Sequence, residues 1–111
     1  VAMKRFRDWA QAIADSSSLV FVGFNAGFDW SFVNWHFQTH LGANPFGFAP
    51  LDIKSYYMGL VGCPWGETKS SKLRPEFRVE PSAKHNALSD AIAQAETFER
   101  MMRANRRALP D

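Results

Sequence analysis

The chain has 111 residues, which is enough for one domain and no more. Hydrophobic residues make up 46% of it and charged residues 22%, a balance typical of a folded globular protein and not of a disordered one. No apolar run is long enough to cross a bilayer, and no signal-peptide pattern is present. The single cysteine, Cys63, cannot form an internal disulfide. We therefore expect a cytoplasmic protein without membrane contact.

The first half of the chain alternates between helix and strand patterns. Residues 2–14 have apolar side chains at helical spacing, and no capping residue precedes them. Because this pattern begins at Val1, we expect the chain to be the C-terminal portion of a longer domain. The unbroken apolar run 19–24 predicts a strand covered on both faces, and a turn at 25–27 follows it. An aromatic-rich helix is predicted from 28 to about 41.

The second half predicts one more strand and two more helices. Residues 46–51 fit a short strand, after which Asp52 would cap a helix at 53–61. The stretch 62–84 is rich in Gly, Pro, Ser and charge, and predicts a long surface loop. Asn86 would then cap a last helix of about four turns with an apolar stripe formed by Leu88, Ala91, Ile92, Ala95, Phe98 and Met102. This order of elements predicts an α/β fold.

Three polar residues lie at positions where an α/β fold can place a functional site. Asp29 follows the first predicted strand and its turn, and sites in α/β sheets form beyond the carboxyl ends of strands. His85 stands just before the last helix, and Asp90 lies one turn inside it, off the apolar stripe. Taken singly, Asp29 would be an acid favoured by the helix dipole, and the other two a loop histidine and a solvated acid. Their combination favours a functional interpretation.

Two stretches of the sequence resemble motifs of one enzyme family. Residues 24–33, FNAGFDWSFV, resemble the second motif of the DEDDh (DnaQ-like, RNase T-like) 3′–5′ exonucleases, H-N-x-x-F-D-x-x-F-L. Residues 85–93, HNALSDAIA, resemble the third motif, H-x-A-L-x-D-A-x-A. Phe24 replaces a histidine of the second motif, and the Asp-x-Glu of the first motif occurs nowhere in the sequence. We interpret the missing motif as truncation.

The resemblance implies a fold and a chemistry. The fold is ribonuclease-H-like, a partial mixed sheet flanked by helices with its first strands absent, and residues 1–111 form a single 3′–5′ exonuclease domain. Asp29 and Asp90 are the implied metal ligands for two Mg²⁺ or Mn²⁺ ions, which favour carboxylate oxygens. His85 is the implied general base, a role suited to an ordinary pKa of about 6.5. With two of the four family carboxylates, the chain alone is expected to be inactive.

The same resemblance implies nucleic-acid partners. We expect Asn25, Phe28 and Lys84 to contact single-stranded or frayed 3′ ends of DNA or RNA. Phe28, Trp30 and Trp35 are candidates for stacking on bases, although most aromatics of this helix are expected in the core. Further candidate phosphate contacts are Lys69, Lys72, Arg74 and Arg78. The charge distribution itself shows a second basic cluster, Arg100, Arg103, Arg106 and Arg107, which fits a phosphate-rich partner, although a charged surface is usually just solvated. A homodimer is a compatible assembly.

Two other functions are compatible with the same residues. One is a catalytically inactive module that binds nucleic acid or protein on the same fold. The other is a small α/β binding domain unrelated to nucleases, in which both motifs are only helix caps and surface acids. Stabilisation by divalent metal would separate them, because structural caps gain nothing from Mn²⁺.

Overall fold

A computed structural model describes residues 1–82 and 86–108, and it divides the chain into two compact units, Val1–Asp52 and Ile53–Asp111. The first unit holds two helices and two short strands: α1 (Ala2–Ala14), β1 (Val22–Gly23), α2 (Ala26–Leu41) and β2 (Leu51–Asp52). The second holds two helices and two 3₁₀ turns: α3 (Ile53–Val61), η1 (Trp65–Glu67), η2 (Ser70–Lys72) and α4 (Ala87–Ala108). That the whole chain forms a single exonuclease domain stays a prediction.

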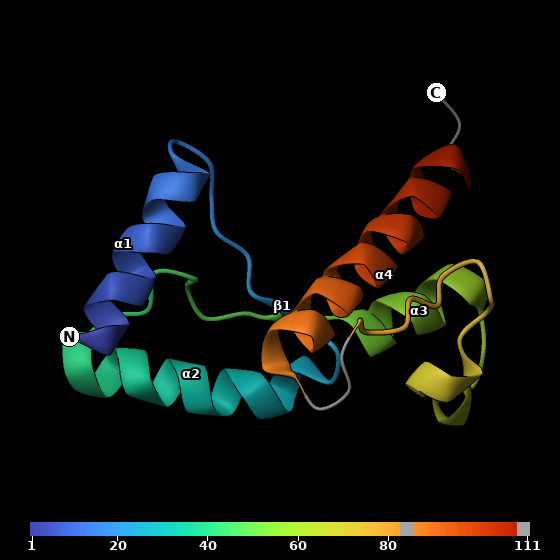
Figure 1. Ribbon diagram of the computed structural model, residues 1–111, viewed down its shortest axis with the longest axis horizontal. Helices are drawn as coiled ribbons and strands as arrows, with labels where there is room; N and C mark the ends of the chain where they lie inside the picture. Colours follow the sequence, from blue (N-terminus) through green and yellow to red (C-terminus); the bar gives the residue numbers. More distant parts are fainter. Residues whose placement is uncertain (83–85, 109–111) are drawn as a thin grey trace. The chain divides into compact units, whose positions relative to one another are not determined.

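The core of the first unit is an aromatic cluster between α1 and α2. Phe6 of α1 lies 5.2 Å from the fully buried Phe37 of α2 and 5.8 Å from Phe46, measured between ring centroids. Tilted and edge-on ring pairs of this kind add about 0.5–1.5 kcal/mol each beyond their buried area. Figure 1 shows the result, with α1 (blue) beside the C-terminal end of α2 (green). The helix predicted at residues 2–14 is confirmed.

The two strands pair in parallel, and α2 connects them. Val22 is opposite Leu51 and Gly23 is opposite Asp52. A parallel pair requires a crossover, and a helix is its usual form. This β1–α2–β2 arrangement is compatible with the predicted α/β class. Within the described residues the sheet consists of these two parallel strands, so the predicted mixed sheet is not seen there.

Both strands are much shorter than the sequence predicts. Of the run 19–24, only Val22 and Gly23 form the strand, and Val20 and Val22 are exposed, so coverage on both faces was a wrong expectation. An apolar run is covered on two faces only where neighbouring strands and helices supply the cover. Residues 45–48 form a turn instead of a strand, and the N–H of Gly47 donates to the carbonyl of Asn44 at 3.0 Å.

The expectation that most α2 aromatics lie in the core is wrong for three of them. Phe28, Phe32 and Trp35 are exposed, whereas Phe37 is buried and Trp30 packs edge-on against Phe21. The helix is apolar on several sides, so α1 and the 45–48 turn can cover only one of them. Hydrophobic spacing alone does not indicate which side that is.

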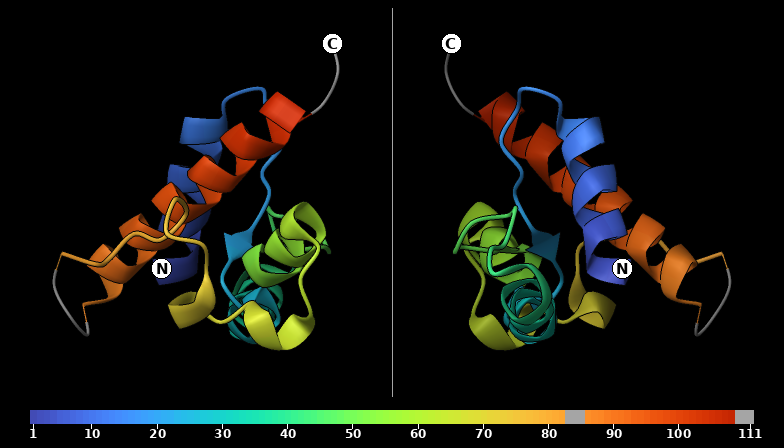
Figure 2. Two further views of the ribbon diagram at one scale, coloured as in Figure 1. Left: turned by 90° about the vertical axis from the view of Figure 1, so that its right-hand side faces the viewer. Right: turned by 90° about the vertical axis from the view of Figure 1, so that its left-hand side faces the viewer.

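The long loop of the second unit is anchored to a helix and buries some of its side chains. α3 spans Ile53–Val61 as predicted, and Figure 2 shows it in yellow-green, followed by the two yellow turns and α4 in orange to red. The predicted surface loop after α3 buries three side chains, Thr68, Leu73 and Phe77. The hydroxyl of Tyr57 accepts a hydrogen bond from the loop N–H of Arg74 at 3.1 Å. The loop is therefore tied to α3.

The buried side of α4 is rotated by one residue from the predicted apolar stripe. Ser89, Ala93, Thr97 and Met101 are buried, while Leu88 is 71% exposed and Ile92 is also exposed. These four residues form one row at a spacing of four, and small side chains in such a row allow close packing. The Ser89 hydroxyl lowers the cost of its burial by donating to the carbonyl of Asn86 at 3.2 Å. The predicted stripe was therefore wrong in phase.

The described residues contain no helix that is long and apolar enough to cross a membrane.

Candidate active site

Asp29 lies at the start of α2, directly beyond the carboxyl end of β1. Its Oδ2 atom lies 3.6 Å from the position that a β carbon would take on the buried Gly23. The side chain is exposed, and among the described residues it has no hydrogen bond or ion pair. An acid in the first helical turn also gains from the positive end of the helix dipole. The predicted placement of Asp29 at a strand end is therefore found.

Asn25 forms the turn that places this carboxylate. It adopts the left-handed conformation, with φ of 63°, which Asn tolerates better than most residues. Its carbonyl accepts a hydrogen bond from the N–H of Phe28 at 3.1 Å. Phe28 is 64% exposed and contacts Phe32 edge-on at 5.1 Å. Three predicted site residues, Asn25, Phe28 and Asp29, are thus gathered in one turn of chain.

Asp52 is a residue of this region whose role the sequence did not suggest. Its Oδ1 atom accepts a hydrogen bond from the backbone N–H of Ala26 at 3.0 Å, which joins the end of β2 to the start of α2. The prediction that Asp52 caps the helix after it stays a prediction. No local signal in the sequence pointed to the bond with Ala26, because Asn is a common N-cap residue, yet Asn25 makes no side-chain cap and leaves an N–H group to be satisfied from elsewhere.

Asp90 lies in the first turn of α4, behind a well-formed helix cap. The Oδ1 atom of Asn86 accepts from the N–H of Ser89 at 3.0 Å, and its carbonyl accepts from the N–H of Asp90 at 2.9 Å. This confirms Asn86 as the N-cap. Asp90 is half-buried, and among the described residues its carboxylate has no partner. It is therefore not a fully solvated surface acid. His85 and Lys84 lie outside the described residues.

Asp29 and Asp90 each offer hard oxygen ligands. Asp29 belongs to the first unit and Asp90 to the second, and neither carboxylate has a cationic partner among residues 1–82 and 86–108. Carboxylate oxygens are the ligands that Mg²⁺ and Mn²⁺ prefer, so the donor chemistry fits these ions. Within residues 1–82 and 86–108, no group of three or more potential ligands is gathered at one place.

The sequence is similar to that of a known nuclease. It is 47% identical over 98 residues to the 3′-5′ DNA exonuclease Cap18 of Escherichia coli. The alignment covers 87% of this chain and 52% of the relative, so the chain spans about half the length of that protein. The uncovered part is too short to reach Asp29 from one end or Asp90 from the other, so both lie in the aligned region. No family model matches the chain.

Proposed function

We propose that the protein is a metal-dependent 3′–5′ exonuclease of the DEDDh type, acting on DNA. The observation that carries the proposal is the 47% identity over 98 residues to a 3′-5′ DNA exonuclease, in an alignment that includes Asp29 and Asp90. The reaction adds water across a phosphodiester bond at a 3′ end. It releases a nucleoside 5′-monophosphate and leaves a strand that is one nucleotide shorter. A ribonuclease-H-like fold is part of the proposal.

The location of the carboxylates supports this chemistry. Asp29 and Asp52 lie at the carboxyl ends of two adjacent parallel strands, which is where sites of α/β sheets form. Asp29 has no protein partner among the described residues, whereas Asp52 bonds to Ala26. The first is therefore available to a metal, and the second stabilises the helix that carries it.

We assign the roles as follows. Asp29 and Asp90 hold Mg²⁺ or Mn²⁺, and His85 accepts the proton of the attacking water. When bound, such cations neutralise negative charge on the phosphate and make water a better nucleophile. The cap formed by Asn86 holds the backbone of the turn that carries the half-buried Asp90. A carboxylate on an ordered turn costs less backbone entropy when it binds a cation.

The substrate is assigned to single-stranded or frayed 3′ ends, held by Asn25, Phe28 and Lys84. The exposed ring of Phe28 is available for stacking on a base, next to the candidate metal ligand Asp29. An unpaired 3′ end can bend to bring its last phosphate to such a ligand, whereas a paired end cannot. The cytoplasm remains our expected location, and a homodimer a compatible state.

Four carboxylates are implied by the resemblance, and the sequence supplies two of them. Asp-x-Glu does not occur in it. We therefore propose that residues 1–111 by themselves do not hydrolyse DNA. The alternative function is a module that binds nucleic acid without cleaving it, on the same fold.

A direct test compares three variants of the protein as its gene encodes it. A 5′-labelled single-stranded oligonucleotide is incubated with Mg²⁺ or Mn²⁺, and its shortening is followed on a gel. Asp29→Asn and Asp90→Asn should each reduce the rate at least about a hundredfold, because a neutral amide binds a hard cation poorly. Asp8→Asn is the control, since Asp8 is exposed on α1 and paired with Arg7.

Three outcomes decide between the functions. Shortening from the 3′ end that depends on Asp29 and Asp90, but not on Asp8, supports the exonuclease. Oligonucleotide binding without shortening, in the presence of either metal, supports the non-cleaving module. Full activity of Asp90→Asn would show that the DEDDh assignment is wrong.

A further inference from the structure

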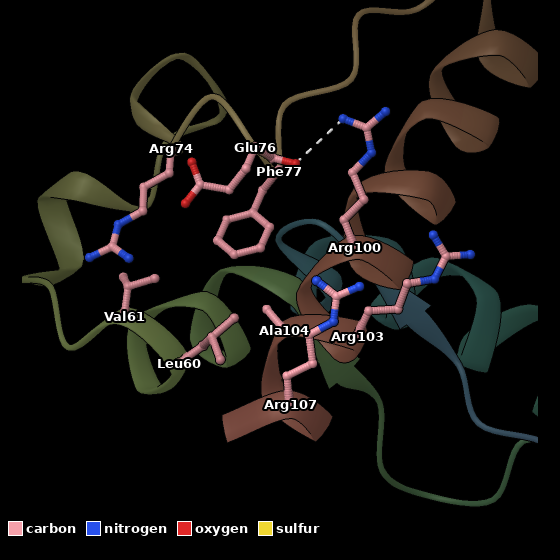
Figure 3. Close-up of a pocket in the computed structure, with 9 residues that line it drawn as sticks. All are labelled: Leu60, Val61, Arg74, Glu76, Phe77, Arg100, Arg103, Ala104 and Arg107. Carbon is pink, nitrogen blue, oxygen red and sulfur yellow. Dashed lines mark hydrogen bonds between the residues drawn. The ribbon is translucent and has the colours of Figure 1, made fainter. Parts of the chain in front are cut away.

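The second unit contains a pocket of about 470 Å³ with four arginines in its wall. We call it the arginine pocket. Its charged lining residues are Arg74, Glu76, Arg100, Arg103 and Arg107, contributed by the anchored loop and the C-terminal half of α4. Figure 3 shows the Phe77 ring between the side chain of Arg74 on one side and those of Arg100 and Arg107 on the other. The lining thus carries four positive charges and one negative charge.

Among the residues that the structure describes, two of the four guanidinium groups have protein partners and two do not. Arg103 pairs with Glu99, one turn earlier on α4. Arg100 donates hydrogen bonds to two backbone carbonyl oxygens of the loop, at 3.1 and 3.5 Å. Within the described part of the chain, neither the Arg74 nor the Arg107 guanidinium makes an ion pair or a hydrogen bond. Both are therefore available to an anion from solution.

The helix dipole explains only part of this cluster. Arginines in the last turn of a helix are favoured by its negative end, and Arg106 and Arg107 lie there. Arg100 lies about two turns earlier, beyond the reach of that effect. Arg74 is not on the helix at all and comes from the loop. Because gathering like charges around one cavity costs stability, the cluster is better explained by a bound anion than by helix stability.

The residues that line the arginine pocket favour a phosphate group that belongs to an extended polymer. The planar guanidinium fork matches two phosphate oxygens at once, which a lysine cannot do. Leu60, Phe77 and Ala104 supply an apolar part of the lining, which strengthens nearby charge interactions. The volume lies within the range of ordinary ligand pockets and exceeds what a lone phosphate would fill. A strand of DNA offers both a phosphate charge and an apolar sugar face at each nucleotide.

We propose that the arginine pocket binds phosphodiester groups of the single-stranded DNA substrate, with Arg74 and Arg107 as two contacts. The inference rests on the proposed function and gives it a nucleic-acid contact in addition to Asn25, Phe28 and Lys84. Nucleoside monophosphates share the anionic chemistry of the strand. The experiment below therefore includes one as a competitor.

The test measures binding in EDTA, so that no strand is cut. A fluorescently labelled oligothymidylate is titrated with the protein, and its anisotropy is followed over a range of salt concentrations. The double variant Arg74→Gln/Arg107→Gln should bind about tenfold or more weakly near 0.1 M salt. The slope of log K against log salt should become shallower by about 0.7 for each lost contact with a single strand. Gln removes the positive charge and keeps a polar side chain that can form hydrogen bonds, and a circular dichroism melt verifies the fold.

The matched control removes the same charge elsewhere. Lys4→Gln/Arg5→Gln replaces two exposed basic residues of α1, neither of which lines the pocket. This control should retain most of the affinity and the slope. If both double variants weaken binding equally, net charge alone explains the effect and the pocket assignment is wrong. Displacement of the oligonucleotide by thymidine 5′-monophosphate, at equal phosphate concentration, would instead indicate a mononucleotide site and overturn the assignment to a strand.

The failure of this inference can be told apart from the failure of the proposed function. Binding in EDTA that depends on Arg74 and Arg107 supports the pocket even if no metal leads to cleavage. Cleavage that depends on Asp29 and Asp90, with binding unchanged in Arg74→Gln/Arg107→Gln, retains the exonuclease and rejects the pocket.

Discussion

The carboxylate of Asp52, at the end of β2, accepts a hydrogen bond from the backbone N–H of Ala26, the first residue of α2, at 3.0 Å. The two residues are 26 positions apart in the sequence. Asn25, the N-cap residue of α2, makes no side-chain cap of its own, so Asp52 supplies an acceptor from the neighbouring strand. One hydrogen bond thus links the sheet to the turn that carries Asp29.

Asp52→Ala should therefore lower the free energy of unfolding by about 1–2 kcal/mol, since it removes an acceptor from a partly buried N–H group. Urea unfolding followed by circular dichroism measures the change. Asp52→Asn is the matched variant, because its amide oxygen can still accept from Ala26. The loss of unfolding free energy in Asp52→Asn should be less than half of that in Asp52→Ala. Equal losses in the two variants would mean that the bond to Ala26 contributes little.

Gly42 ends α2 in the left-handed conformation, with φ of 71°, and its N–H donates to the carbonyl of Gln38 at 3.1 Å. Gly42→Ala should destabilise the protein by about 1 kcal/mol, because a β carbon is disfavoured at this φ. Gly27 is the contrasting position, since it lies inside the same helix with open space around it. Gly27→Ala should stabilise the protein by up to about 1 kcal/mol. Thermal melts of both variants should thus shift in opposite directions.

Local patterns predicted the helices of this chain better than its strands. The bounds of α1 and α3 agree with the prediction, and so do the end of α2 at Leu41 and the Asn86 cap. Each of these signals depends on residues within one or two helical turns. The strand at 46–51 was wrong because pairing depends on a distant partner, and a turn at 45–48 replaces it. Only Leu51 and Asp52 finally pair.

The site shows the same division between local and distant causes. Asp29 and Asp90 could be placed at helix starts from the sequence alone, because a turn and a cap precede them. The hydrogen bond from Ala26 to Asp52 could not be predicted, since it joins two elements by their tertiary arrangement. The rotation of the buried face of α4 was missed for a related reason. Leu88 is exposed and Ser89 is buried. Which of them is buried depends on the elements that pack against α4, and the local sequence does not show those elements.

Removing the cap of α4 should affect both stability and the site. Asn86→Ala leaves the N–H of Ser89 without its acceptor and should cost about 1 kcal/mol of unfolding free energy. Asn86→Asp retains an oxygen acceptor and should remain near the wild type. In the exonuclease assay, Asn86→Ala should also lower kcat, because the cap fixes the turn that carries Asp90. A stable Asn86→Ala protein with unchanged kcat would show that the cap does not position Asp90.

Phe28 allows the stacking role to be separated from a packing role. Its ring is 64% exposed, so Phe28→Ala should change the melting temperature little, although it loses the contact with Phe32. Binding of single-stranded DNA should weaken by about 1–3 kcal/mol if a base stacks on this ring. Phe48→Ala is the control, since Phe48 is 96% exposed and belongs to the 45–48 turn rather than to α2. Anisotropy titrations in EDTA compare the two variants. Equal affinities would remove Phe28 from the nucleic-acid contacts and leave that role to Asn25 and Lys84.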